Sequence, residues 1–301
     1  MTSNGTTPID TNALKLSNPK KLAAGIPAVI SSAKDSLSKM GVAKTIKTLT
    51  MVNQKDGFDC PGCAWPDPDH RSAFEFCENG AKAVADEAMK AKVDRNFFAK
   101  YSIDDLLKKS DYWLNKQGRI SQPMYKKSGS NHYSTLSWEE SISKISDKLK
   151  SLSSPNKAVF YTSGRTSNEA AFLYQAFVRE FGTNNLPDCS NMCHESSGKA
   201  LQSTIGIGKG TVSLEDFNHA DTILVIGQNP GTNHPRMLTA LRDAKLKGAK
   251  IIHINPLPEA GLERFKHPQD YMKLKFNSTQ LSDLHIPVSY THLTLPTTML
   301  V

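Results

Sequence analysis

The sequence predicts an α/β protein with a parallel sheet in its second half and a small, loop-rich cysteine segment in its first half. Two short apolar runs, residues 221–227 and 249–254, flank a helix-forming stretch, and this strand–helix–strand order is typical of a parallel sheet. The first half holds three of the five cysteines in a segment rich in proline and glycine, which favours a loop. Ligands of parallel sheets bind at the carboxyl ends of the strands, so we look for function there and at the cysteines.

Length and composition limit the class of protein. The chain has 301 residues, is 38% hydrophobic and 22% charged, and therefore fits one large or two ordinary soluble domains. It has no apolar run long enough for a membrane helix, so no membrane span is expected. The N-terminal residues show neither a basic stretch followed by an apolar one nor a twin arginine, and we expect a cytoplasmic protein.

The positive charge is concentrated at the start of the chain. Residues 1–55 carry eight lysines against Asp10 and Asp35, a net charge of +6 out of +8 for the whole chain. Such a leader could contact nucleic acid, a membrane surface or an acidic partner, but a solvated extension is the simpler interpretation. The rest of the chain is not basic enough for a nucleic-acid reader, so no nucleic-acid partner is expected.

These patterns predict four segments. Residues 1–50 form a basic, partly flexible leader, residues 51–135 a small domain around the first three cysteines, and residues 136–288 the first part of an α/β domain. Residues 289–301, S-Y-T-H-L-T-L-P-T-T-M-L-V, resemble translated sequencing-adapter tails, and we interpret them as non-native. The alternative is a genuine C-terminal strand. On the first interpretation the chain is a truncated fragment.

The first half predicts helices around one long loop. We expect a short amphipathic helix over 27–40, a loop over 57–70 with three prolines and two glycines, and a helix over 80–100. Ser102 is placed to cap a helix over 103–108. Ser137 is placed to cap a longer helix within 136–152, with Ile142, Ile145 and Leu149 on one face.

The second half predicts alternating strands and helices. A strand over 157–162 is followed by a loop and by a helix over 168–181. A strand over 221–227 leads through Q-N-P-G-T-N-H-P to a helix that starts at Pro235 and ends at Gly248, and a strand over 249–254 follows. The helix over 168–181 is expected to turn one side inward, and that side comprises Ala170, Ala171, Leu173, Phe177 and Phe181.

The C-P-G-C run at 60–63 leaves three kinds of site open. A thioredoxin-like redox motif would stand at the start of a helix, whereas Pro66 and Pro68 follow here. A structural zinc site would need a second close pair, and the next thiol is Cys77 alone. An iron–sulfur cluster takes about four ligands, of which Cys60, Cys63 and Cys77 supply three, with His70 or solvent available as a fourth. Spacing does not decide among cluster, zinc and unligated thiols.

The stretch D-C-S-N-M-C-H-E at 188–195 places Cys193 directly before His194. The pair could be a nucleophile and its base, but adjacent residues of an extended segment point in opposite directions. A soft thiolate beside an imidazole also suits a transition metal that performs redox chemistry. The remaining alternative is that Cys189 and Cys193 are buried as small hydrophobic residues. An odd number of cysteines in a cytoplasmic chain argues against a disulfide framework.

The loop over 227–235, G-Q-N-P-G-T-N-H-P, lies between a predicted strand and a predicted helix. Its glycines allow close backbone approach and its asparagines can form hydrogen bonds, which suits a phosphate or nucleotide. The chain has neither a Walker loop nor a strand followed by G-x-G-x-x-G, so the usual nucleotide fingerprints are absent from its sequence.

Taken together, these stretches resemble the alpha subunit of molybdopterin-dependent oxidoreductases, in the formate-dehydrogenase-like branch. The strings that carry the resemblance span roughly residues 50–288: G-F-D-C-P-G-C-A-W-P-D at 57–67, F-C-E-N-G-A-K-A at 76–83, S-G-R-T-S-N-E-A at 163–170, N-M-C-H-E-S-S-G at 191–198 and V-I-G-Q-N-P-G-T-N-H-P-R at 225–236. The resemblance implies a small iron–sulfur domain followed by part of a parallel-sheet α/β domain of the formate dehydrogenase/dimethylsulfoxide reductase type.

The resemblance also assigns roles to residues. It implies a 4Fe-4S cluster on Cys60, Cys63 and Cys77, and molybdenum bis-molybdopterin guanine dinucleotide with Cys193 on the metal. His194 would assist the proton or hydride step. Lys82 would lie between cluster and pterin. The remaining cofactor contacts implied by the resemblance are Arg165 and Asn168 near the pterin, and Asn229, Pro230, Thr232 and His234 near the guanine dinucleotide.

The implied activity is a two-electron oxidation of a small substrate, formate by analogy. Electrons would pass from molybdenum through the cluster to an acceptor, with an electron-transfer partner subunit as the implied protein partner. As a fragment, the chain alone is expected to be inactive. The alternative function is that of a non-catalytic metal-binding or interaction protein that holds zinc at the C-P-G-C run.

Overall fold

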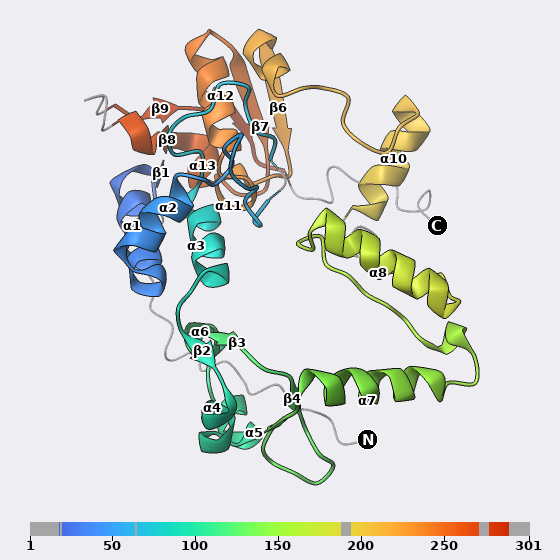
Figure 1. The fold of residues 1–301 in the computed structure, drawn as a ribbon. Coiled ribbons are helices and arrows are strands. Elements are labelled where there is room, and N and C mark those ends of the chain that lie inside the picture. The colour runs from blue at the N-terminus through green and yellow to red at the C-terminus, as the bar shows by residue number, and fades with distance from the viewer. Residues whose placement is uncertain (1–17, 19, 64, 188–193, 271–276, 289–301) are drawn as a thin grey trace. The chain divides into compact units, whose positions relative to one another are not determined.

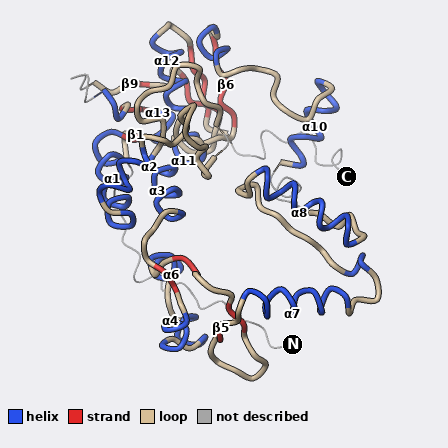
Figure 2. Tube along the Cα trace, in the orientation of Figure 1, coloured by secondary structure: helices blue, strands red, loops and turns tan. Residues whose placement is uncertain are grey.

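The computed structural model describes residues 18, 20–63, 65–187, 194–270 and 277–288 (Figure 1). These residues divide into two compact units, one of residues 28–219 and one that joins residues up to 27 with residues from 220 onward. Helices, strands and long loops alternate along the trace (Figure 2). The expected α/β class is confirmed, whereas the boundaries at 51, 136 and 289 stay predictions.

The unit of residues 28–219 is mainly helical, with two small two-stranded sheets. Strands β2 and β3 pair in parallel and strands β4 and β5 pair antiparallel. Its elements in order are α1 (Gly25–Met40, which begins in the other unit), α2 (Val42–Leu49), α3 (Glu78–Glu87), β2 (Lys92–Val93), α4 (Arg95–Lys100), α5 (Ile103–Leu107), α6 (Asp111–Lys116), β3 (Arg119–Ile120), β4 (Met124–Tyr125), β5 (Ser134–Thr135), α7 (Trp138–Lys150), α8 (Asn168–Phe181) and α10 (Glu195–Ile205).

The second unit is built on a parallel sheet with the strand order β10-β7-β6. Helix α12 covers one face of this sheet with Leu238 and Leu241, which are buried. A smaller sheet, β1-β8-β9, lies in the same unit. The elements are β1 (Ala23–Ala24), β6 (Thr222–Ile226), α11 (Pro230–Asn233), α12 (Met237–Leu246), β7 (Lys250–Ile254), α13 (Ala260–Glu263), β8 (Arg264–Lys266), β9 (Thr279–Gln280) and β10 (Leu284–Ile286).

Side-chain caps explain where several helices begin. Ser102 and Ser137 each form a capping box, because the serine side chain accepts the N3 amide while the N3 carboxylate, Asp105 or Glu140, accepts the cap amide. Each helix starts where the sequence predicted. The predicted helix over 80–100 is wrong as one element: α3 ends at Glu87, and Asp94 caps a new helix, α4, after the strand β2.

Part of the expected leader is folded. Residues 25–49 form α1 and α2, which bury Met40 and Leu49, and α2 contacts α3. The Lys39 ammonium lies between the carboxylates of Asp35 and Asp86, which ties α1 to α3. The helix predicted over 27–40 is confirmed as α1. No described helix is both long and apolar enough to cross a membrane.

The strand predicted over 157–162 does not form in the described structure. Residues 158–160 are extended, but their backbone bonds to an irregular segment: the Phe160 amide donates to the Asn185 carbonyl at 2.9 Å, and Asn185 Nδ2 donates to the Ala158 carbonyl at 3.0 Å. A side-chain amide replaces a neighbouring strand here. Ala158, Phe160 and Val178 form a small buried cluster.

The predicted apolar faces of α7 and α8 are confirmed only near the ends of the helices, where Leu149 and Phe181 pack against the buried cluster of Ala158, Phe160 and Val178. In α8 the buried residue is Val178, with Tyr174 and Phe181 packed beside it, while Leu173 and Phe177 are 66% and 47% exposed. In α7, Ile142 and Ile145 are 62% and 60% exposed. The period of the apolar residues predicted both helices correctly, but it does not specify which part of a wide apolar stripe is covered.

The parallel sheet buries a histidine. His253 of β7 is 0% exposed and is paired in register with His285 of β10, and the two rings stack with centroids 4.6 Å apart. Among the described residues neither ring nitrogen of His253 has a hydrogen-bond partner. Burial, and then the neighbouring His285, lower the pKa of His253 from 6.5 to about 4. The folded sheet therefore holds the neutral ring.

We predict that this unit loses stability in acid. The unfolded chain binds a proton at His253 below about pH 6.5, whereas the folded chain binds it only near pH 4. The free energy of unfolding should thus be constant above pH 7 and fall by up to about 3 kcal/mol between pH 6.5 and 4. Urea titrations across this range would measure it. His253→Phe should flatten the profile, and the exposed control His219→Gln should leave it unchanged.

Candidate functional site

The first three cysteines come together at the start of α3. Cys77 is the N-cap residue of α3, and its Sγ accepts the Gly80 amide at 3.3 Å. The Sγ of Cys60 accepts the Gly62 amide, also at 3.3 Å. The charges of Cys60 and Cys63 both act on Cys77, so all three thiols are electrostatic neighbours. We call Cys60, Cys63 and Cys77 the thiol centre.

Gly80 provides the space for the thiol centre. A Cβ atom at this position would lie 2.8 Å from Cys60 Sγ and 3.7 Å from Cys77 Sγ. A carbon–sulfur contact of 2.8 Å is well inside van der Waals separation, so any side chain at position 80 would displace Cys60. Gly80 is buried in the first turn of α3, next to Ala81. The two sulfurs therefore approach the helix backbone itself.

The side chain of Asn53 holds both ends of the cysteine loop. Its Oδ1 accepts the Cys60 amide at 2.7 Å, and its Nδ2 donates to the Glu75 carbonyl at 2.7 Å. Asn53 is 3% exposed and has a φ of 55°, a left-handed conformation that asparagine tolerates better than most residues. Gln54 adds a third bond, from Nε2 to the Ser72 carbonyl at 2.9 Å. Sequence analysis missed Asn53, because no cysteine-spacing motif includes it.

The electrostatics of the thiol centre depend on what binds there. Burial raises the pKa of Cys77, the Gly80 amide lowers it, Cys60 and Cys63 raise it, and the Asn79 amide lowers it. Cys77 therefore favours its protonated form when no cation is bound, while the Gly80 and Asn79 amides favour a sulfur that carries negative charge. A bound cation would remove the mutual repulsion of the thiolates. Within the described residues, no three His, Cys, Asp or Glu side chains close around a single metal ion.

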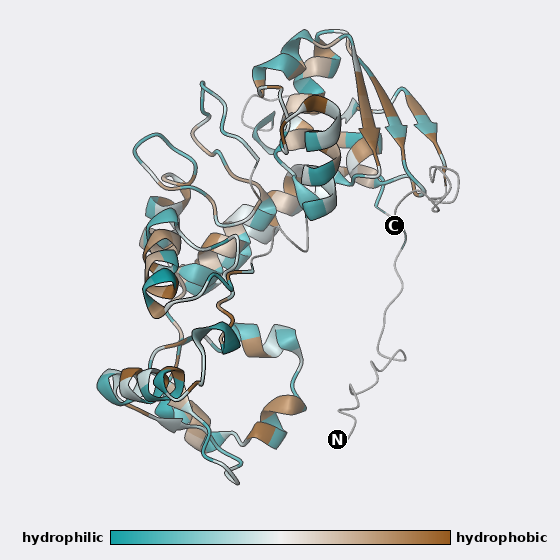
Figure 3. Ribbon diagram, turned by 90° about the vertical axis from the view of Figure 1, so that its right-hand side faces the viewer, coloured by the Kyte–Doolittle hydropathy of each residue, from teal (hydrophilic) through white to brown (hydrophobic). Residues whose placement is uncertain are grey.

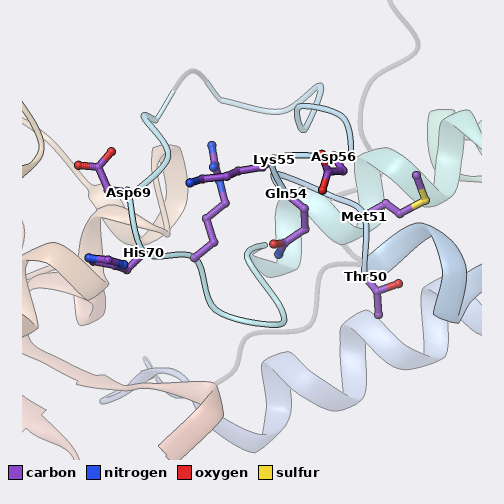
Figure 4. A pocket seen from close by; sticks show the side chains of 9 residues that line it. Thr50, Met51, Gln54, Lys55, Asp56, Asp69 and His70 are labelled. Carbon is purple, nitrogen blue, oxygen red and sulfur yellow. The ribbon is translucent and has the colours of Figure 1, made fainter.

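A polar hollow of about 520 Å³ is lined by residues before the cysteine loop and by residues near the end of that loop (Figure 4). Lys55 and Asp56 come from the chain before the loop, and Asp69, His70 and Arg71 come from within it. Cations and anions are mixed, so the lining does not select one charge of ligand. The remaining lining residues are Thr50, Met51, Gln54 and Gly57.

The structure places the other predicted site residues separately. Cys193, and Cys189 beside it, lie outside the described residues. His194 is described: it is exposed and precedes α10 as its N-cap residue, without a side-chain cap. Lys82 stands on α3 and pairs with Glu78 at 2.6 Å. Arg165 and Asn168 lie just before and at the start of α8, respectively.

The predicted nucleotide loop forms a compact turn after β6. Asn229 is the N-cap residue of α11 and Pro230 is buried at its first position. Gln228 Nε2 lies 3.1 Å from His234 Nδ1, which fixes the end of the turn. Thr232 lies within α11. The turn thus brings all four predicted residues, Asn229, Pro230, Thr232 and His234, to the carboxyl end of a parallel strand.

Two glycines bring this turn against the next one. A Cβ on Gly231 would lie 3.0 Å from the Gly261 Cα, and a Cβ on Gly261 would lie 2.8 Å from the Gly231 Cα. Gly231 belongs to α11, after β6, and Gly261 to α13, after β7. The backbones at the ends of neighbouring strands therefore touch, which leaves backbone atoms rather than side chains at this edge of the sheet.

A family comparison assigns this combination of features. A sequence model described as "Molybdopterin oxidoreductase" matches residues 119–289, more than half of the chain. The chain belongs to the molybdopterin oxidoreductase family. The family inferred from the sequence strings is therefore confirmed, and membership implies a molybdenum–pterin cofactor.

Two of three reported relatives of this molybdopterin oxidoreductase chain carry the name of an oxidoreductase or a dehydrogenase. An uncharacterised oxidoreductase of Mycobacterium tuberculosis (strain ATCC 25618 / H37Rv) is 58% identical over 261 residues, which are 86% of this chain and 34% of that protein. Protein YdeP of Escherichia coli (strain K12) is 50% identical over 275 residues, 91% of this chain and 36% of that protein. The alpha subunit of F420-dependent formate dehydrogenase 1 from Methanococcus maripaludis is 34% identical over 145 residues, 48% of this chain and 21% of that subunit.

The chain thus spans about a third of the length of the Mycobacterium tuberculosis and Escherichia coli relatives. Among solved structures, acetylene hydratase from Pelobacter acetylenicus aligns with 56% of this chain and 22% of its own, at 18% identity and a TM-score of 0.43. This likeness is too distant to carry an argument about the site.

We predict that Asn53 is required for a stable cysteine loop. Asn53→Ala removes two short, partly buried hydrogen bonds and leaves the Cys60 amide and Glu75 carbonyl without them, which should cost about 2 kcal/mol. Thermal unfolding would report the loss, and alkylation of Cys60 should become faster as the loop loosens. The exposed Asn96→Ala is the matched control and should change stability by less than about 0.5 kcal/mol. Equal melting curves for the two variants would contradict the role of Asn53.

Proposed function

We propose that the chain is part of a molybdopterin-dependent oxidoreductase whose thiol centre binds a 4Fe-4S cluster. The observation that carries this proposal is the convergence of Cys60, Cys63 and Cys77 at the start of α3, where backbone amides donate to two of the sulfurs. Cysteine thiolates are the usual ligands of such clusters, and hydrogen bonds to the sulfurs tune their potential.

The residues fit a cluster better than they fit the alternatives that the sequence left open. No helix begins at Cys60 or Cys63, whereas a thioredoxin-like motif needs one there. A structural zinc site needs a second close pair of ligands, and the next thiol after the C-P-G-C run is Cys77 alone. The thiol centre supplies three cluster ligands, and a non-cysteine group, His70 or solvent, completes the set in this proposal.

The same proposal gives roles to the remaining predicted residues. A bound molybdenum–pterin group would supply two-electron redox chemistry, with Cys193 as the metal ligand. His194, exposed at the start of α10, would accept or donate the proton that accompanies the electrons. Lys82 would place a positive charge on α3, the helix that Cys77 caps. The turn from Asn229 to His234 would contact the guanine dinucleotide.

Formate is the proposed substrate by analogy. The support is the Methanococcus maripaludis relative, which is named as a formate dehydrogenase subunit. Electrons from formate would pass to an electron-transfer partner subunit through the cluster. Because the chain spans about a third of the Mycobacterium tuberculosis and Escherichia coli relatives, we expect these 301 residues alone to be inactive. Formate oxidation by the chain alone would contradict that expectation.

The first test is the metal content of the thiol centre. The chain, expressed and purified without oxygen, should carry iron and acid-labile sulfide in equal amounts, with little zinc. Cys77→Ser should lower both by at least several-fold, because serine keeps the cap hydrogen bond of α3 but is a poor cluster ligand. Zinc in place of iron would overturn the proposal and leave a structural metal-binding protein as the function.

The matched control uses glycines. Gly80→Ala places a methyl group 2.8 Å from Cys60 Sγ and should also reduce the iron content. Gly210→Ala meets no atom within 4 Å and should leave the iron content unchanged. Molybdenum is measured separately, in a chimera of residues 1–288 with the part of the Escherichia coli relative that follows the matched region. Iron without molybdenum in that chimera would keep the cluster and reject the pterin part of the proposal.

A further inference from the structure

Helix α3 carries an Asn-Gly dipeptide, Asn79–Gly80, in its first turn. In a flexible chain this dipeptide is chemically unstable, because glycine has no side chain that keeps its amide nitrogen away from the preceding asparagine. The sequence holds the same dipeptide at residues 4–5, which lie outside the described residues. The dipeptide in α3 is therefore the one whose surrounding contacts are described.

The reaction of such a dipeptide is deamidation, and its only co-reactant is water. The Gly80 amide nitrogen attacks Cγ of Asn79, its proton passes to the side-chain nitrogen, and ammonia leaves as the Cγ–Nδ2 bond breaks. Water then opens the resulting succinimide ring at either carbonyl. The products are aspartate and isoaspartate, and no electrons are gained or lost.

In the folded chain the attacking nitrogen is already engaged. The Gly80 N–H donates to Cys77 Sγ at 3.3 Å, and Gly80 is buried in the first turn of α3. The succinimide ring fixes the ψ of asparagine far from the helical value of about −42°. Ring closure thus requires Asn79 to leave the helix, so deamidation should proceed only through local opening of this turn.

Packing of the asparagine side chain does not add to this protection. Ala81, Val84 and Ala85 form the buried side of α3. The helical period places Asn79 on the opposite side. Helices of the chain in Figure 3 likewise carry hydrophilic residues, in teal, beside hydrophobic ones, in brown. The protection therefore depends on the backbone of the first turn, and hence on the Cys77 cap.

The thiol centre also explains why the reactive dipeptide contains a glycine. Any side chain at position 80 would collide with Cys60, because a Cβ there would lie 2.8 Å from its Sγ. The glycine that admits the sulfurs to the helix is thus the glycine that makes Asn79 reactive. The geometry of the thiol centre creates a chemically weak bond and, through Cys77, also shields it.

We propose that Asn79–Gly80 is a latent deamidation site, closed while Cys77 caps α3 and opened when that cap is lost. Isoaspartate lengthens the backbone and removes the helical geometry that brings Gly80 against the sulfurs. Both products add a negative charge close to Cys77, which disfavours its thiolate. Because the ammonia is lost to solvent, a chain that has reacted cannot rebuild the original thiol centre. The proposal does not depend on the proposed cluster or substrate.

The first measurement compares the folded chain with an unstructured reference. Peptide mass spectrometry during incubation in mildly alkaline buffer gives the rate of deamidation at Asn79. The reference is a synthetic peptide of residues 76–83 with its cysteine alkylated. The rate in the 301-residue chain should be at least about ten-fold lower than in the peptide, because the first turn must open. Equal rates would overturn the proposal.

The second measurement isolates the cap. Cys77→Ser and Cys77→Ala both lack the thiol, so they affect any metal at the thiol centre alike, but only serine can accept the Gly80 amide. Deamidation at Asn79 should be about five-fold faster in Cys77→Ala than in Cys77→Ser, the factor that corresponds to about 1 kcal/mol of capping free energy. Equal rates in the two variants would overturn the role of the cap.

Two controls separate local opening from other causes. Ser137→Ala removes the cap of a different helix, α7, and should leave the rate at Asn79 unchanged. A similar acceleration by Ser137→Ala would show global unfolding and overturn the assignment to the Cys77 cap. Asn79→Gln should abolish the mass change of this peptide, and a mass change that persists would place the reaction at another residue.

A third measurement tests the consequence for the thiol centre. Deamidated and intact chains differ by one negative charge and can be separated by ion exchange. Alkylation of Cys60 by iodoacetamide should be several-fold faster in the deamidated fraction, because Gly80 no longer holds the first turn against its sulfur. Equal alkylation of the two fractions would overturn the claim that deamidation disables the thiol centre.

Discussion

The candidate site depends on one pair of hydrogen bonds, both made by Asn53. Through its Oδ1 and Nδ2 atoms this buried side chain holds the Cys60 amide and the Glu75 carbonyl, and so fixes the beginning and the end of a loop that contains several prolines and no regular structure. Cysteines on an irregular loop have no helix or sheet to position them. A single side-chain amide, held in a left-handed backbone conformation, replaces that scaffold.

Local chemistry made part of the fold predictable. The serine caps at Ser102 and Ser137 and the parallel sheet that contains β6 and β7 were predicted from patterns over a few residues, and each was confirmed. The burial of helix faces was not predictable in the same way. Apolar residues extend around α8 over more than one face, and the covered side, that of Val178, depends on a partner segment far along the chain.

The residues of the candidate site also differ in how far they could be predicted from the sequence. The cysteines could be found from spacing, because a C-x-x-C run followed by a third thiol is a local pattern. Asn53 and Gly80 could not be found in this way. Their roles arise from contacts between segments far apart in sequence, and a lone asparagine or glycine carries no signal of such a contact. The strand expected over 157–162 failed for a related reason, since Asn185 provides the bonds that a neighbouring strand would have made.

Cys77 has two independent roles, and a substitution can remove one of them while keeping the other. As N-cap it anchors the first turn of α3 through the Gly80 amide, and as a thiol it belongs to the thiol centre. A serine hydroxyl fulfils the first role well and the second poorly. Cysteine and serine codons differ by one nucleotide, so a single mutational step would remove the proposed metal ligand while retaining the helix. The fold of this region is therefore separable from the proposed cluster, and descendants that keep the architecture without that cluster would be easy to reach.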